Sequence, residues 1–246
     1  MALTRADCLI WENLSDRGLI PSNPSLLEIG QANWYGDMPI SWLAEHAKRR
    51  QPKLLPDLEE ADRGMQVFRI ANIFYRCLLD VRRSVAIDLH PPPGSEAHRL
   101  DLNEPIDLGE KFDVVVNTGT VEHVFDQRRA LQTIHDHCNV GGLMLHAGPL
   151  AGWPDHGLFH AQPGLWLDLA RANAYDVLML VYFDMSGGHA QAVQGRAEMH
   201  QITWANGSMV YAVLRKKDEE PFRVPMQRVY SENPDSQTVE DWRTMR

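Results

Sequence analysis

The segment FDVVV at residues 112–116 is the clearest buried strand in the chain. It is apolar almost throughout and rich in β-branched valine, which suits a strand that is covered on both faces of a sheet. The polar run Asn117-Thr118-Gly119 follows at once and marks the point where the strand ends. A strand of this kind predicts an α/β protein with a parallel sheet at its centre.

Further strands and helices alternate on both sides of this segment. Strands are predicted at residues 25–29, 84–88, 143–146 and 177–183, and helices at residues 126–138 and 163–174. This alternation predicts a doubly wound, mainly parallel sheet with helices on both faces. Residues 208–214 follow Asn206-Gly207, which fits either a hairpin with residues 199–204 or a strand inserted antiparallel.

A long segment separates the first strand from the second. About fifty residues lie between Gly30 and the strand at 84–88, where a single crossover helix needs far fewer. Apolar spacing predicts one helix near residues 37–50 and an amphipathic helix near residues 65–78. We therefore expect a helical insertion over residues 38–82, which is either extra packing on one face or a wall of the substrate pocket. Its apolar helix is a candidate homodimer face.

Composition excludes several classes of protein. A formal net charge of −9 argues against nucleic-acid partners, which need clustered Lys and Arg. The three cysteines are widely spaced and form no C-x-x-C pair, so we expect neither disulfides nor a zinc site, and a cytoplasmic setting. No apolar run reaches the ~18 residues that a membrane span needs, and the first residues do not resemble a secretory signal. Residues 1–216 are predicted to form the domain, and the polar residues 217–246 a C-terminal surface tail.

The order of motifs resembles that of class I S-adenosylmethionine-dependent methyltransferases over roughly residues 22–215. The segment LLEIGQA at residues 26–32 resembles the turn after the first strand of that family, and NTGTVEHV at residues 117–124 resembles the turn after the fourth. The resemblance implies a seven-stranded Rossmann-like sheet with a reversed last strand, and S-adenosyl-L-methionine as the cofactor.

The resemblance also implies roles for individual residues. Asp88 would hold the ribose hydroxyls with Leu89 beside the adenine, and Asp101-Leu102 would flank the adenine amine. The methionine part would pass the two turns, which supply Glu28, Gly30, Gln31, Ala32, Asn117, Thr118, Gly119 and His123. A carboxylate suits a ribose diol because its two oxygens can accept both hydroxyl protons.

The turn after the first strand departs from the family pattern. Ala32 stands where many members have a second glycine, and the bulky Trp34-Tyr35 follows. This departure keeps open a non-catalytic, methyltransferase-like scaffold or binding domain. A nicotinamide-dependent oxidoreductase is a poor alternative, because the turn lacks the later glycines of G-x-G-x-x-G.

The loop after the fifth strand of the resemblance, residues 148–160, is the predicted acceptor site, because ligands bind beyond the carboxyl ends of parallel strands. We expect Trp153, Asp155 and Phe159 to contact a small-molecule acceptor, and His156 or His160 to act as the general base. His156 and His160 have metal-ligand spacing, but Gly157 lies between them and no third ligand is near in sequence, so we predict no metal. The expected reaction is O-methylation of a hydroxyl, in a sugar or natural product, or of a carboxylate.

Overall fold

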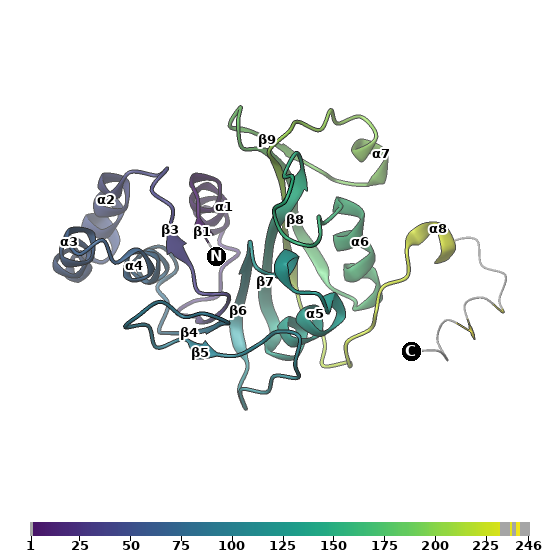
Figure 1. Ribbon diagram of the computed structural model, residues 1–246, viewed down its shortest axis with the longest axis horizontal. Helices are drawn as coiled ribbons and strands as arrows, with labels where there is room; N and C mark the ends of the chain where they lie inside the picture. The colour runs from purple at the N-terminus through teal and green to yellow at the C-terminus, as the bar shows by residue number, and fades with distance from the viewer. Residues whose placement is uncertain (1, 232–236, 238–239, 242–246) are drawn as a thin grey trace.

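An eight-stranded sheet forms the centre of the computed structural model, which describes residues 2–231, 237 and 240–241 (Figure 1). Its strands, in spatial order, are β5 (His98–Arg99), β4 (Arg83–Asp88), β2 (Ser25–Ile29), β6 (Phe112–Thr118), β7 (Cys138–Ala151), β10 (Ser208–Arg215), β8 (Asp176–Asp184) and β9 (His189–Ala192). The strands from β5 to β7 are parallel, and β10 is antiparallel to both of its neighbours. The mainly parallel sheet and the reversed last strand are therefore confirmed, and β9 adds an eighth strand at the outer edge.

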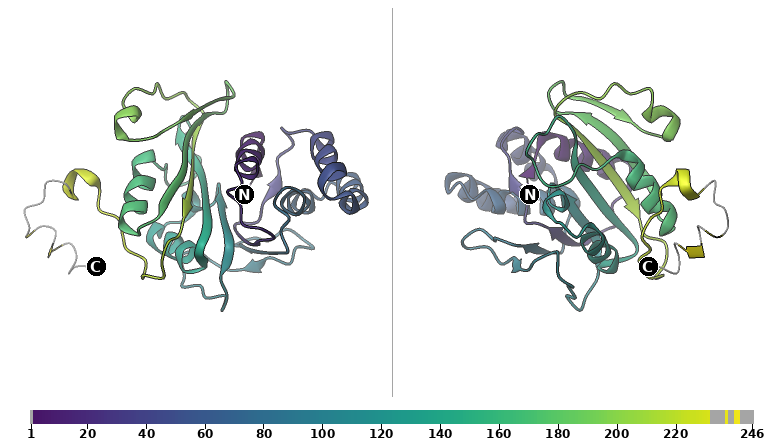
Figure 2. Two further views of the ribbon diagram at one scale, coloured as in Figure 1. Left: turned by 180° about the vertical axis from the view of Figure 1, so that it is seen from behind. Right: turned by 45° about the vertical axis from the view of Figure 1, so that its right-hand side comes forward.

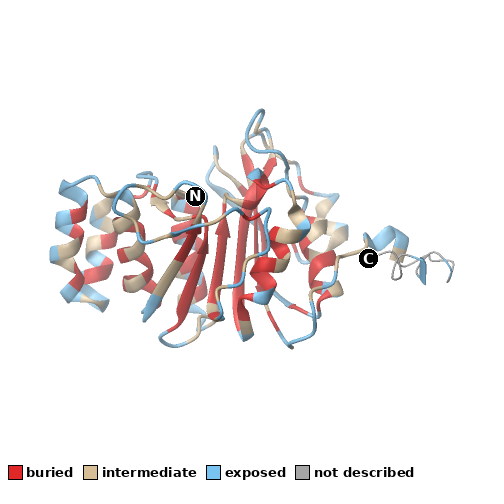
Figure 3. Ribbon diagram, turned by 60° about the horizontal axis from the view of Figure 1, so that its bottom comes forward, coloured by how far each residue is buried: buried red, intermediate tan, exposed pale blue. Residues whose placement is uncertain are grey.

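Helices cover both faces of the sheet (Figure 2). On one face lie α5 (Gln127–Asp136) and α6 (Pro163–Ala172), and on the other lie α1 (Arg5–Asp16) and α4 (Val67–Leu79). Side chains of β6 alternate between the two cores, since Val114 and Val116 pack with α1 and α4 while Val115 packs with α5 and α6. The central strands are buried on both faces (Figure 3), which explains their continuous apolar sequence.

The long segment between β2 and β4 is a helical layer. It contains β3 (Asn33–Trp34), α2 (Ile40–Arg50), η1 (Pro52–Leu54), α3 (Leu55–Arg63) and α4. In the views of Figures 1 and 2, α2 and α3 lie outside α4, whose apolar side chains belong to the core beneath. The insertion therefore packs against the core, and the apolar face of α4, a candidate dimer face, is covered within the chain. Side chains of α3 and α4 also line a cavity beside β4, so a role as a wall of the substrate pocket stays a prediction.

Two elements differ from the expectation for the last third of the domain. Residues 199–204 form no strand, so the hairpin alternative is wrong and β10 is inserted between β7 and β8. The polar stretch before it contains β9 and the short helix α7 (Arg196–Met199). None of the helices in the described residues has the length and apolar character needed to cross a membrane.

The N-terminal residues form structure that the sequence patterns do not predict. Strand β1 (Ala2–Leu3) pairs with β3, and Thr4 caps α1 through a capping box with Asp7. At the other end, residues 217–227 run along α5 and α6 toward α8 (Arg228–Ser231). Asn173 holds this segment by exchanging two hydrogen bonds with the backbone of Arg223, at 2.9 and 2.7 Å. The rest of the predicted tail lies largely outside the described residues.

Candidate functional site

The parallel strands end at one edge of the sheet, and a cavity of about 250 Å³ opens there beside β2, β4 and β6. Its lining residues are Gly30, Ile87, Asp88, Leu89, Leu100, Asp101, Leu102, Asn103, Gly119, Thr120, His123 and Val124. This set contains most of the residues that the sequence motifs assign to the cofactor. Motifs that are far apart in the sequence therefore meet at one cavity.

Asp88 lies at the rim of this cavity, where β4 ends. Its Oδ2 accepts a hydrogen bond from the backbone N–H of Gln31 at 2.9 Å, and its Oδ1 accepts one from His90 at 2.8 Å. Each carboxylate oxygen has about two acceptor sites, so each can accept a further hydrogen bond. The side chain thus holds the turn after β2 against β4 and keeps capacity for a hydroxyl ligand.

The turn after β2 is shaped from below by buried groups. Glu28 is buried, which raises its pKa to about 7, and its Oε2 accepts a hydrogen bond from the N–H of Ala32 at 2.8 Å. Gly30 has a φ of +82°, and a Cβ there would lie 2.2 Å from Oγ1 of Thr120. Ala32 is fully buried and is not among the residues with positive φ. Alanine is therefore compatible with the turn, while Gly30 could not be replaced without moving Thr120.

Five residues assigned to the cofactor do not line the cavity, namely Glu28, Gln31, Ala32, Asn117 and Thr118. Asn117 is buried at the end of β6, where its Oδ1 accepts a hydrogen bond from the N–H of Val121 at 3.1 Å. Its Nδ2 lies 3.4 Å from Nδ1 of His146. Asn117 therefore supports the turn from inside the fold.

Several lining residues have no role in the motif-based prediction. Ile87, Leu100 and Val124 add apolar surface to the cavity, and Thr120 closes it next to Gly30. Each of them directly adjoins or lies within a predicted motif. Sequence position could have suggested them, but only the fold shows that their side chains face the cavity.

A long extension of β7 carries the next loop over this edge of the sheet. The pairing of β6 with β7 ends at Thr118 and Ala147, whereas β7 continues to Ala151 along β10. Beyond it, the N–H groups of Leu158 and Phe159 donate to the carbonyl oxygen of Glu122 at 2.7 and 3.1 Å. These two hydrogen bonds attach the predicted acceptor loop to η2 (Val121–His123).

Gly157 allows this close approach. Its φ is +77°, and a Cβ there would lie 3.0 Å from both Cγ and the carbonyl oxygen of Glu122. A larger residue would be strained in this backbone conformation and would push the loop away from η2.

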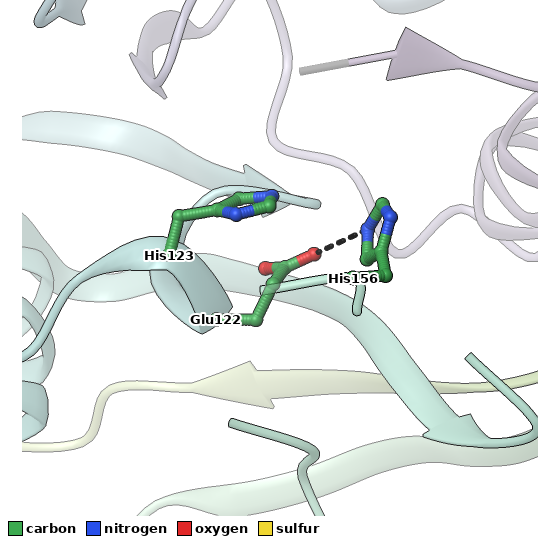
Figure 4. A group of neighbouring side chains, drawn as sticks. All are labelled: Glu122, His123 and His156. Carbon is green, nitrogen blue, oxygen red and sulfur yellow. Dashed lines mark ion pairs between the residues drawn. The ribbon is translucent and has the colours of Figure 1, made fainter. Parts of the chain in front are cut away.

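Glu122, His123 and His156 form a cluster where the loop meets η2, and we call them the Glu122 cluster (Figure 4). Nε2 of His156 lies 3.8 Å from Oε1 of Glu122, and the two imidazole rings are 5.2 Å apart. The Glu122 side chain is only 6% exposed, and this burial raises its pKa to about 7. Burial lowers the pKa of His123, because it disfavours the charged imidazolium. His123 also lines the cavity, so the cluster adjoins the cavity.

The two predicted bases occupy different surroundings. His156 belongs to the Glu122 cluster, and its ring lies 5.3 Å from that of Trp153. His160 is exposed, and its Nε2 lies 3.2 Å from the carbonyl oxygen of Trp153. The indole N–H of Trp153 donates to the carbonyl of Ser208 at 2.7 Å, which fixes the ring. Of the two predicted bases, His156 is therefore the one that faces another ionisable group.

Aromatic surface lies beside the cluster. Phe159 is 38% exposed, and its ring lies 6.2 Å from that of Phe125, which is 77% exposed. Leu158, which precedes Phe159 in the loop, is also exposed, as is Asp155. An exposed group of large apolar side chains next to a polar cluster is typical of a binding site.

A family model described as a methyltransferase domain matches residues 71–207, which is more than half of the chain. The chain belongs to the methyltransferase family. Its resemblance to class I S-adenosylmethionine-dependent methyltransferases is thereby confirmed, together with the Rossmann-like fold that this class shares. No curated protein sequence matches this methyltransferase.

A solved methyltransferase structure has the same fold. The 1,6-didemethyltoxoflavin N1-methyltransferase of Burkholderia thailandensis, with 1,6-didemethyltoxoflavin and S-adenosylhomocysteine bound, matches 87% of this chain and 78% of its own. The TM-score is 0.50 at 14% identity. The N-methyltransferase NodS from Bradyrhizobium japonicum, with S-adenosylhomocysteine, covers 87% of each chain with a TM-score of 0.49 and 14% identity. At 14% identity, the match to the Burkholderia enzyme shows the fold alone.

Proposed function

We propose that this methyltransferase transfers a methyl group from S-adenosylmethionine to a hydroxyl group of a small metabolite, such as a sugar or natural product, or to a carboxylate. The observation that carries the proposal is that the cavity at the strand ends and the Glu122 cluster share His123. A cofactor in the cavity and an acceptor at the cluster would meet at His123, which belongs to both.

The residues of the cavity fit the adenosine part of the cofactor. Asp88 and Asp101 supply acceptors for hydroxyl and amine protons, and Ile87, Leu89 and Leu102 supply apolar surface for a flat ring. Gly30 and Gly119, both with positive φ, let the backbone come close to a ligand between the two turns. When bound, the cofactor supplies an electrophilic methyl group on a sulfonium centre.

The loop after β7 is the proposed acceptor site. Trp153 and Phe159 offer rings on which a flat or apolar acceptor can pack, and Asp155 offers a further polar contact. We retain His156 and His160 as the candidates for removing the acceptor proton, and the contact with Glu122 favours His156. A hydroxyl acceptor benefits from such a base, whereas an amine that is already neutral does not need one.

We further propose a small acceptor rather than a nucleic acid, and a cytoplasmic setting. The net charge of −9 supports the first statement, because a nucleic-acid groove requires clustered positive charge. The second is consistent with the three cysteines, which are buried and form no disulfide. A homodimer stays a prediction.

Calorimetric titration of the full chain with S-adenosylhomocysteine tests the proposal first. We expect stoichiometric binding, and a protein that does not bind at millimolar ligand would instead be a methyltransferase-like scaffold. Methyl transfer from isotopically labelled S-adenosylmethionine to a panel of alcohols, carboxylic acids and amines tests the acceptor. Labelling of amines alone would overturn the O-methylation proposal.

A further inference from the structure

We propose that Glu122, His123 and His156 bind one divalent transition-metal cation of the zinc type, with an open coordination position toward the acceptor loop. The cation site follows from the geometry of the Glu122 cluster alone. That an oxygen of the acceptor occupies the open position rests additionally on the proposed function.

The three side chains offer ligand atoms that already converge. One atom from each residue lies within 4.8 Å of the other two, and Nε2 of His156 is 3.8 Å from Oε1 of Glu122. Around a tetrahedral Zn²⁺ with bonds of 2.0–2.1 Å, ligand atoms are about 3.4 Å apart. The ligand atoms are therefore farther apart than around a bound ion, and we expect side-chain rotations to bring them together on binding.

The ligand atoms have no competing partners among the residues that the structure describes. Oε1 of Glu122 is buried and accepts no hydrogen bond, and 3.8 Å is too long for one with His156. Neither imidazole of the cluster makes a hydrogen bond to another described residue. A buried carboxylate oxygen without a partner is costly in free energy, and a cation bound between it and the two rings removes that cost.

The backbone holds the ligands in place from two elements. Glu122 and His123 come from η2, and His156 comes from the loop after β7. The carbonyl of Glu122 accepts the hydrogen bonds from Leu158 and Phe159 that attach this loop to η2. The contact that positions His156 over Glu122 is thus independent of any bound ion.

The composition of the ligand set indicates the class of metal. Two imidazoles and one carboxylate suit Zn²⁺ and other first-row divalent ions, while Mg²⁺ prefers oxygen ligands only. Catalytic zinc sites have three protein ligands and keep one position for water or substrate. His156 has a side chain that is 46% exposed, so a ligand can reach the site from the acceptor loop.

The cation would change the role of His156. As a ligand it cannot also remove the acceptor proton, and a coordinated hydroxyl instead loses its proton to solvent more readily because the cation lowers its pKa. His160, which lies outside the cluster, is not needed as a ligand. The sequence does not indicate this site, because the ligands come from two segments that are far apart in the chain. The i, i+4 spacing of His156 and His160 is not used in it.

Metal titration of the full chain, without cofactor or acceptor, tests the inference. We expect one Zn²⁺ per chain by calorimetry, the visible absorption of a low-coordinate site with Co²⁺, and no binding of Mg²⁺. Glu122→Gln and His156→Ala should each weaken Zn²⁺ binding at least tenfold, whereas the control His98→Ala, at an exposed histidine of β5, should bind as the parent does.

Circular dichroism of each variant checks folding, and the Co²⁺ spectrum of the unaltered protein provides a measurement that needs no variant. Absence of stoichiometric Zn²⁺ binding, or binding that survives both substitutions in folded protein, overturns the inference. Binding of S-adenosylhomocysteine by the metal-free protein, measured in parallel, separates this outcome from failure of the proposed function. Protein that binds the nucleoside but not Zn²⁺ is a methyltransferase whose Glu122 cluster works without a metal.

Discussion

At the rim of the cavity, Asp88 accepts two backbone hydrogen bonds and still has acceptor capacity on both carboxylate oxygens. Asp88→Ala removes both the contact with Gln31 that holds the turn and the acceptors proposed for the ribose. We expect the affinity for S-adenosylhomocysteine to fall well beyond tenfold, because two charge-assisted hydrogen bonds are lost. Calorimetry measures this effect directly.

Asp107→Ala is the matched control for this substitution. Its Oδ1 accepts a hydrogen bond from the N–H two residues on, that of Gly109, in the same way as Asp88 accepts from His90, but it lies away from the cavity. We expect Asp107→Ala to leave affinity unchanged. Equal affinity in the Asp88 and Asp107 variants would show that the ribose assignment is wrong.

His156 and His160 lie in one loop, but only His156 contacts Glu122. His156→Ala should lower turnover about 10²-fold or more, whether the ring accepts a proton or holds a cation, while the affinity for S-adenosylhomocysteine stays unchanged. His160→Ala should have the smaller effect. Single-turnover kinetics with a labelled methyl group measure both variants. A larger loss of turnover in the His160 variant would show that the proton acceptor lies outside the Glu122 cluster.

Among the structural elements, the loop after β7 depends on one glycine. Gly157→Ala places a Cβ 3.0 Å from the carbonyl oxygen of Glu122 in a left-handed conformation. We expect loss of the hydrogen bonds from Leu158 and Phe159, and a fall in turnover larger than the change in stability explains. Gly188→Ala is the control, because Gly188 has a similar φ of +64° and nothing within 4 Å.

The Gly188 variant should lose about 1 kcal/mol of stability from its backbone strain alone and keep its activity. Comparing urea unfolding with turnover in the two variants separates strain from displacement of the loop. If both variants keep full turnover, the attachment of the loop to η2 is not required for the reaction.

Elements with a clear period could be predicted from sequence, and elements that depend on distant partners could not. The strand predicted at residues 112–116 follows from a continuous β-branched run and lies within β6. The helix predicted at 163–174 follows from Pro163 near its start and Asn173 near its end, and the structure has it at Pro163–Ala172. Strand β3 has two residues and exists because it pairs with β1 at the start of the chain. The extension of β7 to Ala151 likewise depends on pairing with β10.

At the scale of the whole molecule, buried acidic side chains make the free energy of unfolding depend on pH. Burial raises the pKa of Asp7 from 3.8 to about 6, so the folded state binds a proton in this range that the unfolded state has released. Stability from this group is therefore complete below pH ~4 and is lost as the pH rises through ~6. Two pKa units correspond to about 3 kcal/mol.

Asp7→Asn removes this ionisation. The difference in unfolding free energy between the variant and the parent should shift in favour of the variant by about 2–3 kcal/mol between pH 4 and pH 7. Urea unfolding at the two pH values measures it, with Asp62→Asn, an exposed residue of α3, as the control. A difference that does not vary with pH would mean that Asp7 does not ionise as its burial indicates.

The sequence alone determined the α/β class, because this depends on local apolar periodicity. It also determined which residues follow the ends of the strands, because short motifs mark these positions. It also predicted that the loop at residues 148–160, with its aromatic residues and histidines, binds the acceptor, and this stays a prediction. What it could not determine is which histidine meets which acid. Glu122 and His156 come together only because β7 extends past β6 and Gly157 lets the loop bind the carbonyl of Glu122. Contacts between distant residues arise from packing, and no local pattern in the chain encodes them.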